Sequence, residues 1–261
     1  MNLTAGWYCF KGILVREFLR FVQQRSRFLS ALVRPLLWLI VFAAGFRAAL
    51  GIAIIEPYET YITYETYIAP GLCCMILLFN GMQSSLSMVY DREMGSMRVL
   101  LMSPLPRPYL LLCKMVSTAL ISLTQVYAFL LIALLVEVEP PLLGYITVLP
   151  ALMLVALLLS SLGLFLSTRI KQLENFAGVM NFVIFPMFFL SSALYPLWKM
   201  QEASEWLYWI CMANPFTYAV ELVRHALYVK LDVNSLMITA GATLLFAGLA
   251  VTGFNPQKSA K

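Results

Sequence analysis

The sequence predicts an all-α membrane protein with six transmembrane helices, and two observations carry this prediction. Hydrophobic residues make up 61% of the 261 residues and charged residues only 12%, whereas soluble domains are about 45–50% apolar and roughly 25% charged. Several apolar runs are also long enough to cross a bilayer, which takes about 20 helical residues. The chain is therefore expected to form a single domain, residues 1–261, in a lipid bilayer.

The N-terminal stretch, residues 5–32, predicts an amphipathic helix that lies in the membrane interface. Phe10, Leu14 and Phe18 fall near one helical face, while Lys11 and Arg20 lie on another. A basic helix of this kind buries its apolar face in the bilayer and turns its arginines toward anionic headgroups.

Six apolar runs follow in the order expected for transmembrane spans. They cover residues 36–55, 68–90, 109–136, 145–168, 176–194 and 233–254. Pro35 falls at the first turn of the first span, where its missing N–H costs nothing. Between spans five and six, residues 195–232 hold only short apolar runs, broken at Asn214–Pro215. We expect this segment to dip into the outer leaflet and return as a re-entrant segment.

The positive charges predict the orientation of the chain. Most of the 18 lysines and arginines fall in the N-terminal stretch, in the loops after spans two and four, and in the C-terminal tail. The positive-inside rule places these segments, and with them both termini, in the cytoplasm.

A polar segment, Asp91–Tyr109, separates spans two and three. Met97, Leu100 and Leu101 have helical spacing, and Pro104 would end such a helix because proline lacks an N–H donor. The segment therefore predicts a short helix over residues 91–104, with an ordinary connecting loop as the alternative.

Residues that would carry catalysis or hold a cofactor are not apparent in the sequence. No G-x-x-x-x-G-K-[ST] motif for binding ATP phosphates occurs. The single histidine, His225, follows Glu221 by one helical turn, which favours a surface ion pair over a metal or catalytic site. We therefore predict no catalytic residue, no metal site and no cofactor bound by this chain, and no nucleic-acid partner.

Polar residues inside the predicted spans form the candidate substrate pathway: Arg47, Asn80, Ser84, Gln125 and Asn181. Such residues commonly hydrogen-bond neighbouring helices instead, so both interpretations stay open. A charge at the depth of Arg47 either snorkels to the outer surface or takes part in an ion pair or substrate contact.

The polar segment also carries a family resemblance, on Arg92, Glu93, Gly95, Leu100, Leu101 and Pro104. This pattern after the second span resembles the hallmark of ABC-2-type permeases, the membrane subunits of ATP-binding-cassette exporters. In that family the segment is the coupling helix that docks into the ATPase. Arg98 stands where the family often has a second acidic residue, so the ion pairing at the dock differs here.

A second signature lies in the predicted re-entrant segment. The stretches FFLSSALYPL and NPFTYAVELVR are similar to the family's re-entrant pair. They contribute Asn214, Pro215, Tyr218, Glu221 and Arg224.

The resemblance implies the permease subunit of an ABC exporter for a small or lipid-like substrate. Two copies would form the pathway in a bacterial inner membrane, and a separate ATPase subunit would bind ATP and Mg²⁺. Stretches such as LLFNGMQSSLSMVYDREMGSMR resemble most closely permeases of the alcohol-utilisation type, which are related to lipo-oligosaccharide and drug exporters. The alternative is a passive channel or a membrane assembly factor without ATP coupling.

Overall fold

The computed structural model describes residues 3–23, 25–46, 57–58, 62–95, 105–136, 138–170 and 172–254, and its regular elements there are helices. In chain order these are α1 (Leu3–Gln23), α2 (Arg25–Phe46), α3 (Tyr64–Glu93), α5 (Arg107–Ala133, extended by a 3-10 turn, Leu134–Val136), α6 (Gly144–Arg169), α7 (Leu173–Phe189), α8 (Leu197–Ala203), α9 (Glu205–Ala213), α10 (Pro215–Leu227) and α11 (Val233–Gly253).

Four helices of the described chain are long and apolar enough to cross a membrane. They are α3, α5 with its 3-10 turn, α6 and α11. Shorter apolar stretches occur in α2, over residues 32–41, and in α7, over residues 173–189. The all-helical prediction is therefore confirmed, and four of the six predicted spans meet these criteria of length and composition.

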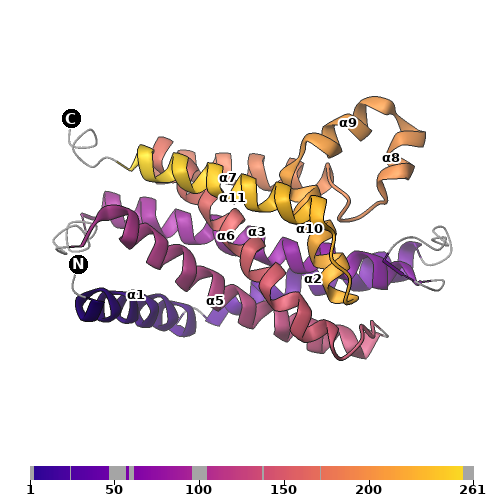
Figure 1. Cartoon of the computed structure of the whole chain (residues 1–261), viewed down its shortest axis with the longest axis horizontal. Coiled ribbons are helices and arrows are strands. Elements are labelled where there is room, and N and C mark those ends of the chain that lie inside the picture. The colour runs from indigo at the N-terminus through magenta and orange to yellow at the C-terminus, as the bar shows by residue number, and fades with distance from the viewer. Residues whose placement is uncertain are drawn as a thin grey trace.

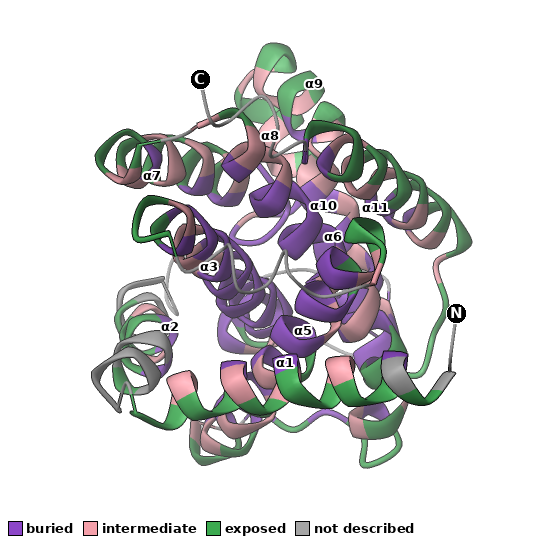
Figure 2. Cartoon of the chain, turned by 90° about the vertical axis from the view of Figure 1, so that its left-hand side faces the viewer, coloured by how far each residue is buried: buried purple, intermediate pink, exposed green. Residues whose placement is uncertain are grey.

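The core of the bundle lies around α3 and α6, and the buried residues concentrate there in Figure 2. Helix α6 packs on α3, α5, α10 and α11. Glycines allow α3 and α6 to approach closely: a Cβ at Gly81 would lie 2.8 Å from the carbonyl carbon of Leu159, and a Cβ at Gly163 would lie 2.9 Å from the carbonyl oxygen of Gly81. Small residues thus let α3 and α6 pack closely.

The two ends of the bundle hold different elements (Figure 1). The N-terminal end of α1 and the C-terminal end of α11 lie at one end of the long axis, and α8, α9 and α10 lie toward the other. We refer to these as the α1 end and the α10 end.

The helices begin earlier than the sequence suggested. Helix α2 begins at Arg25, so Pro35 lies inside it and not at its first turn. The stretch 5–32 is consequently divided between α1 and the first turns of α2. Helix α3 begins at Tyr64 and not near Ile68, which adds four residues, 64–67, to the helix.

Two tyrosines in the first turn of α3 are buried. Tyr64 is 2% exposed and Tyr67 1% exposed. The Tyr64 hydroxyl donates to the carbonyl of Leu194 over 2.9 Å, and the Tyr67 hydroxyl donates to that of Ser192 over 3.0 Å. Their role is thus to satisfy backbone carbonyls of the turn after α7, where no helix partner exists.

Candidate functional site

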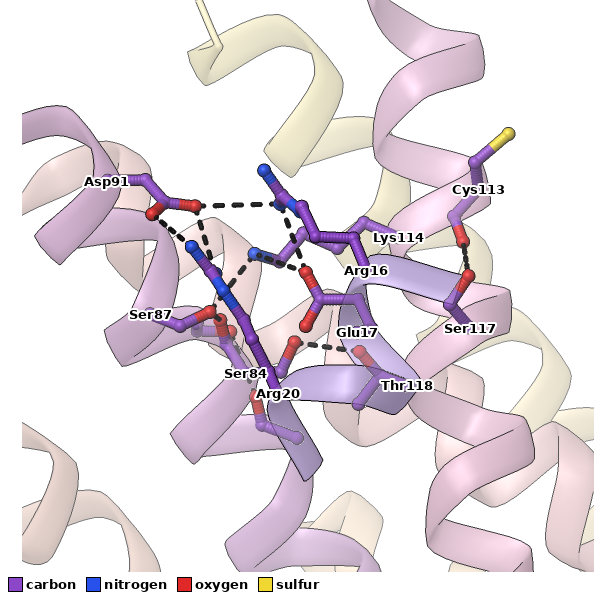
Figure 3. A network of polar contacts seen from close by, with 12 residues as sticks. Arg16, Glu17, Arg20, Ser84, Ser87, Asp91, Cys113, Lys114, Ser117 and Thr118 are labelled. Carbon is purple, nitrogen blue, oxygen red and sulfur yellow. Dashed lines mark hydrogen bonds and ion pairs between the residues drawn. The ribbon is translucent and has the colours of Figure 1, made fainter. Parts of the chain in front are cut away.

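Five charged side chains from three helices meet at the α1 end of the bundle (Figure 3). Arg16, Glu17 and Arg20 come from α1, Asp91 from the last turn of α3, and Lys114 from the third turn of α5. We call these five residues the charge cluster. It joins the N-terminal helix to two helices that are long enough to span a membrane.

Asp91 is the centre of one half of the charge cluster. Arg20 donates to both of its carboxylate oxygens, with Nη2 to Oδ1 at 2.8 Å and Nη1 to Oδ2 at 3.2 Å. Arg16 Nη2 lies 3.5 Å from Asp91 Oδ2. A two-pronged arginine–carboxylate pair fixes orientation as well as distance, so α1 and the end of α3 are held in one register.

Glu17 and Lys114 form the other half. Glu17 Oε1 lies 3.1 Å from Arg16 Nη2 and 3.7 Å from Lys114 Nζ. Lys114 Nζ also donates to Ser87 Oγ over 3.1 Å. Because both partners are almost wholly buried, each needs the other: a buried charge without a partner is strongly unfavourable.

The charges of the α1 residues are stabilised in place. Burial alone would raise the pKa of Glu17, but the positive charges of Lys114 and Arg16 outweigh it and hold that pKa below its usual value. The hydrogen bonds with Asp91 raise the pKa of Arg20. The cluster therefore favours the charged forms of Glu17 and Arg20.

Apolar contacts also join α1 to α5. Ile13 packs with Leu110 and Cys113, and the Tyr109 hydroxyl donates to the carbonyl of Gly6 over 2.9 Å. Arg20 thus faces protein partners, whereas the sequence placed it against lipid headgroups. The prediction was wrong because an isolated helical wheel does not show that Asp91 would lie opposite.

The polar segment after α3 is described only at its start. Asp91, Arg92 and Glu93 form the last turn of α3, with Arg92 half-buried and Glu93 exposed. Gly95 follows at φ +74°, the left-handed conformation that glycine commonly provides after a helix end. The remaining predicted coupling residues, Arg98, Leu100, Leu101 and Pro104, lie outside the described residues.

The candidate pathway residues of α3 are hydrogen-bonded to α5. Ser84 Oγ lies 2.7 Å from Thr118 Oγ1, and the side-chain amide Nδ2 of Asn80 donates a hydrogen bond to the side-chain oxygen Oε1 of Gln125. A cavity of about 30 Å³ lies beside them, lined by Glu17, Phe21, Asn80, Ser84, Thr118, Ile121 and Ser122. These contacts favour the helix-packing interpretation of Asn80, Ser84 and Gln125 over pathway lining.

The other two candidate pathway residues are placed differently. Asn181 is exposed on α7. Arg47 lies outside the described residues, so both interpretations of it stay open.

The second signature is organised around the start of α10. The side-chain oxygen Oδ1 of Asn214 accepts a hydrogen bond from the backbone N–H of Phe216 over 3.0 Å, so Asn214 caps the N-terminus of α10. Pro215 occupies the first position of the helix. The Asn214 amide donates to the carbonyls of Met187 and Leu190, at 2.8 and 2.7 Å. Asn214 therefore fixes the beginning of α10 to the end of α7.

Arg224 forms a second charged site, near the α10 end. Its side chain is 2% exposed and pairs with Glu221 one turn earlier. Its Nη2 donates to the carbonyl of Ser192 over 2.8 Å, and its guanidinium carbon lies 4.0 Å from the centre of the Tyr67 ring. We call Tyr67, Ser192, Glu221 and Arg224 the Arg224 cluster. Tyr218, the remaining signature residue, is half-buried on the same helix.

The charge cluster was not predicted as a site, although two signals in the sequence pointed to it. Lys114 lies inside the predicted third span, where a charge requires a partner. Glu17 is the one acidic residue among the first 55. Long-range pairing between them is invisible in the sequence because 97 positions separate the two residues.

Known proteins are similar to this chain in sequence. Residues 8–228 match the ABC-2 type transporter family. Relatives carrying the name "Putative transport permease ycf38" are 28% identical in Porphyra purpurea and 30% identical in Pyropia yezoensis, each over 86% of this chain and 75% of the relative. The relative of that name in Cyanophora paradoxa is 27% identical over 81% of this chain and 71% of its own. With its apolar helical bundle, the chain belongs to the ABC-2 type transporter family and is a transport permease.

Proposed function

We propose that this chain is the permease subunit of an ABC exporter, which forms the pathway for a small or lipid-like substrate and is driven by a separate ATPase subunit. The observation that supports it is the charge cluster. Asp91 is the first residue of the predicted coupling segment, 91–104, and lies in the last turn of α3, which ends at Glu93. A movement of that segment therefore acts directly on a residue that α1 holds with two arginines.

In this proposal the ATPase docks against α1 and residues 91–104. ATP and Mg²⁺ are bound by that partner and not by this chain. Docking displaces the end of α3, and the ion pairs of the charge cluster pass the displacement to α1 and, through Glu17 and Lys114, to α5. Three helices then move as a unit, because no member of the cluster can leave without exposing a buried charge.

The same proposal assigns the α1 end to the cytoplasm of a bacterial inner membrane, with both termini on that side. Helices α2 and α7 then complete the six spans. Helix α7 has 17 residues and is about 25 Å long, at the lower limit for crossing the hydrocarbon. The segment from α8 to α10 forms the outer re-entrant part, and a second copy of the chain supplies the other half of the pathway.

Purification of the tagged permease from its native membrane tests the proposal. A soluble ATPase with a phosphate-binding loop should copurify, and its ATP turnover should rise with the permease present. We expect Glu93→Ala combined with Leu100→Ala to abolish this stimulation, while Glu205→Ala on α9 leaves it unchanged. Flux through reconstituted permease without any ATPase or ATP would instead support the passive channel. The closer likeness to alcohol-utilisation permeases stays a prediction about the substrate.

A further inference from the structure

An exposed arginine of α2 is held against a neighbouring helix. The guanidinium carbon of Arg34 lies 3.9 Å from the centre of the Phe79 ring of α3. Arg34 is nine residues beyond Arg25, where α2 begins, so it lies about 14 Å along the helix. In the proposed orientation this depth is within the inner leaflet, where a charged side chain is costly and marks a functional contact.

Aromatic side chains close the space on the outward side of Arg34. Trp38, one turn farther along α2, packs against Phe188 and Phe189 of α7, with ring centres 5.8 and 5.5 Å apart. Helices α2 and α7 therefore meet at the level of Trp38. Both also pack on α3, and Figure 2 shows α3 between them.

The burial of helix α3 changes at Phe79. From Tyr64 to Leu78 it is buried at every position except the half-buried Thr66, but from Phe79 onward one face is open. Phe79, Gln83 and Leu86 are half-buried and Tyr90 is exposed, at spacings of four, three and four residues. An open stripe therefore runs along α3 from the α1 end up to Arg34, where the contact between Trp38 and the α7 phenylalanines begins.

Arg34 makes no ion pair within the described part of the chain. Its guanidinium lies against the Phe79 ring, an interaction of a cation with the face of an aromatic ring. This contact holds the guanidinium in place and leaves its N–H donors for an external anion. The planar group can donate two parallel hydrogen bonds to a phosphate or carboxylate.

We propose that Arg34 and Phe79 bind the anionic headgroup of a membrane amphiphile, which enters along the open stripe of α3 from the inner leaflet. This inference rests on the proposed function and names its substrate class. The headgroup takes the guanidinium of Arg34, and the apolar chain lies against α2, where Val33, Leu37 and Ile40 are exposed. Charge complementarity favours an anion over a zwitterionic or neutral headgroup.

The test uses the permease alone, reconstituted in phosphatidylcholine vesicles. Phosphatidylglycerol and phosphatidylcholine, each carrying a nitroxide high on the acyl chain, are compared by the immobilised fraction of their electron spin resonance spectra. We expect phosphatidylglycerol to be preferred about fivefold, the preference that one cation near an anionic headgroup confers. Arg34→Gln should reduce that preference to about onefold, Arg34→Lys should retain part of it, and Phe79→Leu should weaken it because the guanidinium loses its platform.

The matched control is Arg169→Gln. Arg169 is also an exposed arginine beside a phenylalanine, with its guanidinium carbon 5.7 Å from the centre of the Phe165 ring, but it lies at the end of α6. This substitution should leave the preference unchanged. A preference that persists undiminished in Arg34→Gln overturns the proposal. Its loss in excess inorganic phosphate at constant ionic strength also overturns it, because that result would indicate a site for free anions. Because no ATPase takes part, failure of the coupling experiment leaves this result unaffected.

Discussion

The two charged sites of this permease bury arginines in opposite ways. In the charge cluster, Arg16 and Arg20 are each about one-third exposed, and Arg16, Glu17 and Asp91 each contact two oppositely charged partners. In the Arg224 cluster, one arginine is almost completely buried, and its acidic partner lies one turn away on its own helix. The first site therefore links three helices through shared charged partners, whereas the ion pair of the second lies within one helix.

The comparison indicates which end of the bundle is held more rigidly. Arg224 of α10 and Tyr67 of α3 both donate to the carbonyl oxygen of Ser192, in the turn after α7. This one oxygen therefore joins both helices to the turn. At the α1 end, by contrast, the bonds join separate helices, and two of the side chains, Arg16 and Arg20, are about one-third exposed. We therefore expect the α10 end to determine stability and the α1 end to determine coupling.

The largest effect should come from removing the buried arginine. Arg224→Ala leaves the Glu221 carboxylate and the Ser192 carbonyl without their cation, and breaking a buried pair in this way costs about 3–5 kcal/mol. Thermal unfolding in detergent should show a clear fall in Tm relative to Lys199→Ala, a half-buried cation on α8. An unchanged Tm would mean that Arg224 is not a fixed tie.

An intermediate effect is expected at Asp91. Asp91→Asn removes the carboxylate that Arg20 and Arg16 share, and hydrogen bonds to a charged group are worth about 1.5–3 kcal/mol. Exchanging the charges, Arg20→Asp with Asp91→Arg, should recover part of the lost ATPase stimulation. Equal loss in the single and exchanged variants would contradict the idea that this pair transmits movement.

A smaller effect should follow from Tyr67→Phe. This change removes one hydrogen bond to the Ser192 carbonyl but keeps the ring against Arg224, so the free energy of unfolding should fall by about 0.5–1.5 kcal/mol. Tyr8→Phe, an exposed tyrosine on α1, is the control in the same unfolding assay. A loss as large as that of Arg224→Ala would show that the hydroxyl, and not the cation, anchors the turn.

The smallest effect is a pH dependence confined to the charge cluster. The pKa of Glu17 is lower in the folded protein than its usual value. Its contribution to stability is therefore complete above the unfolded pKa of about 4.3 and is lost as the pH falls through the folded pKa. Tm should decrease below about pH 4, and this decrease should be smaller in Glu17→Gln. Identical profiles for Glu17→Gln and the parent would contradict the assignment.

Apolar composition and periodicity determined the helices, because crossing a bilayer requires long apolar segments whatever their neighbours are. Hence α5, α6 and α11 lie close to the predicted spans, and the family was evident from local motifs. The starts of α2 and α3 were less predictable, since polar residues such as Tyr64 and Tyr67 can extend a helix once carbonyl partners are found elsewhere in the chain.

Composition, apolar periodicity and local motifs were thus enough to identify the membrane class, most of the helical segments and the ABC-2 family. Only the tertiary structure decided which charges meet. Asp91 with Arg20, Lys114 with Glu17, and Arg34 with Phe79 are pairs whose members lie far apart in the chain. The physical reason is that a buried charge requires a partner but does not specify one, and the packing of α1, α2, α3 and α5 makes the choice.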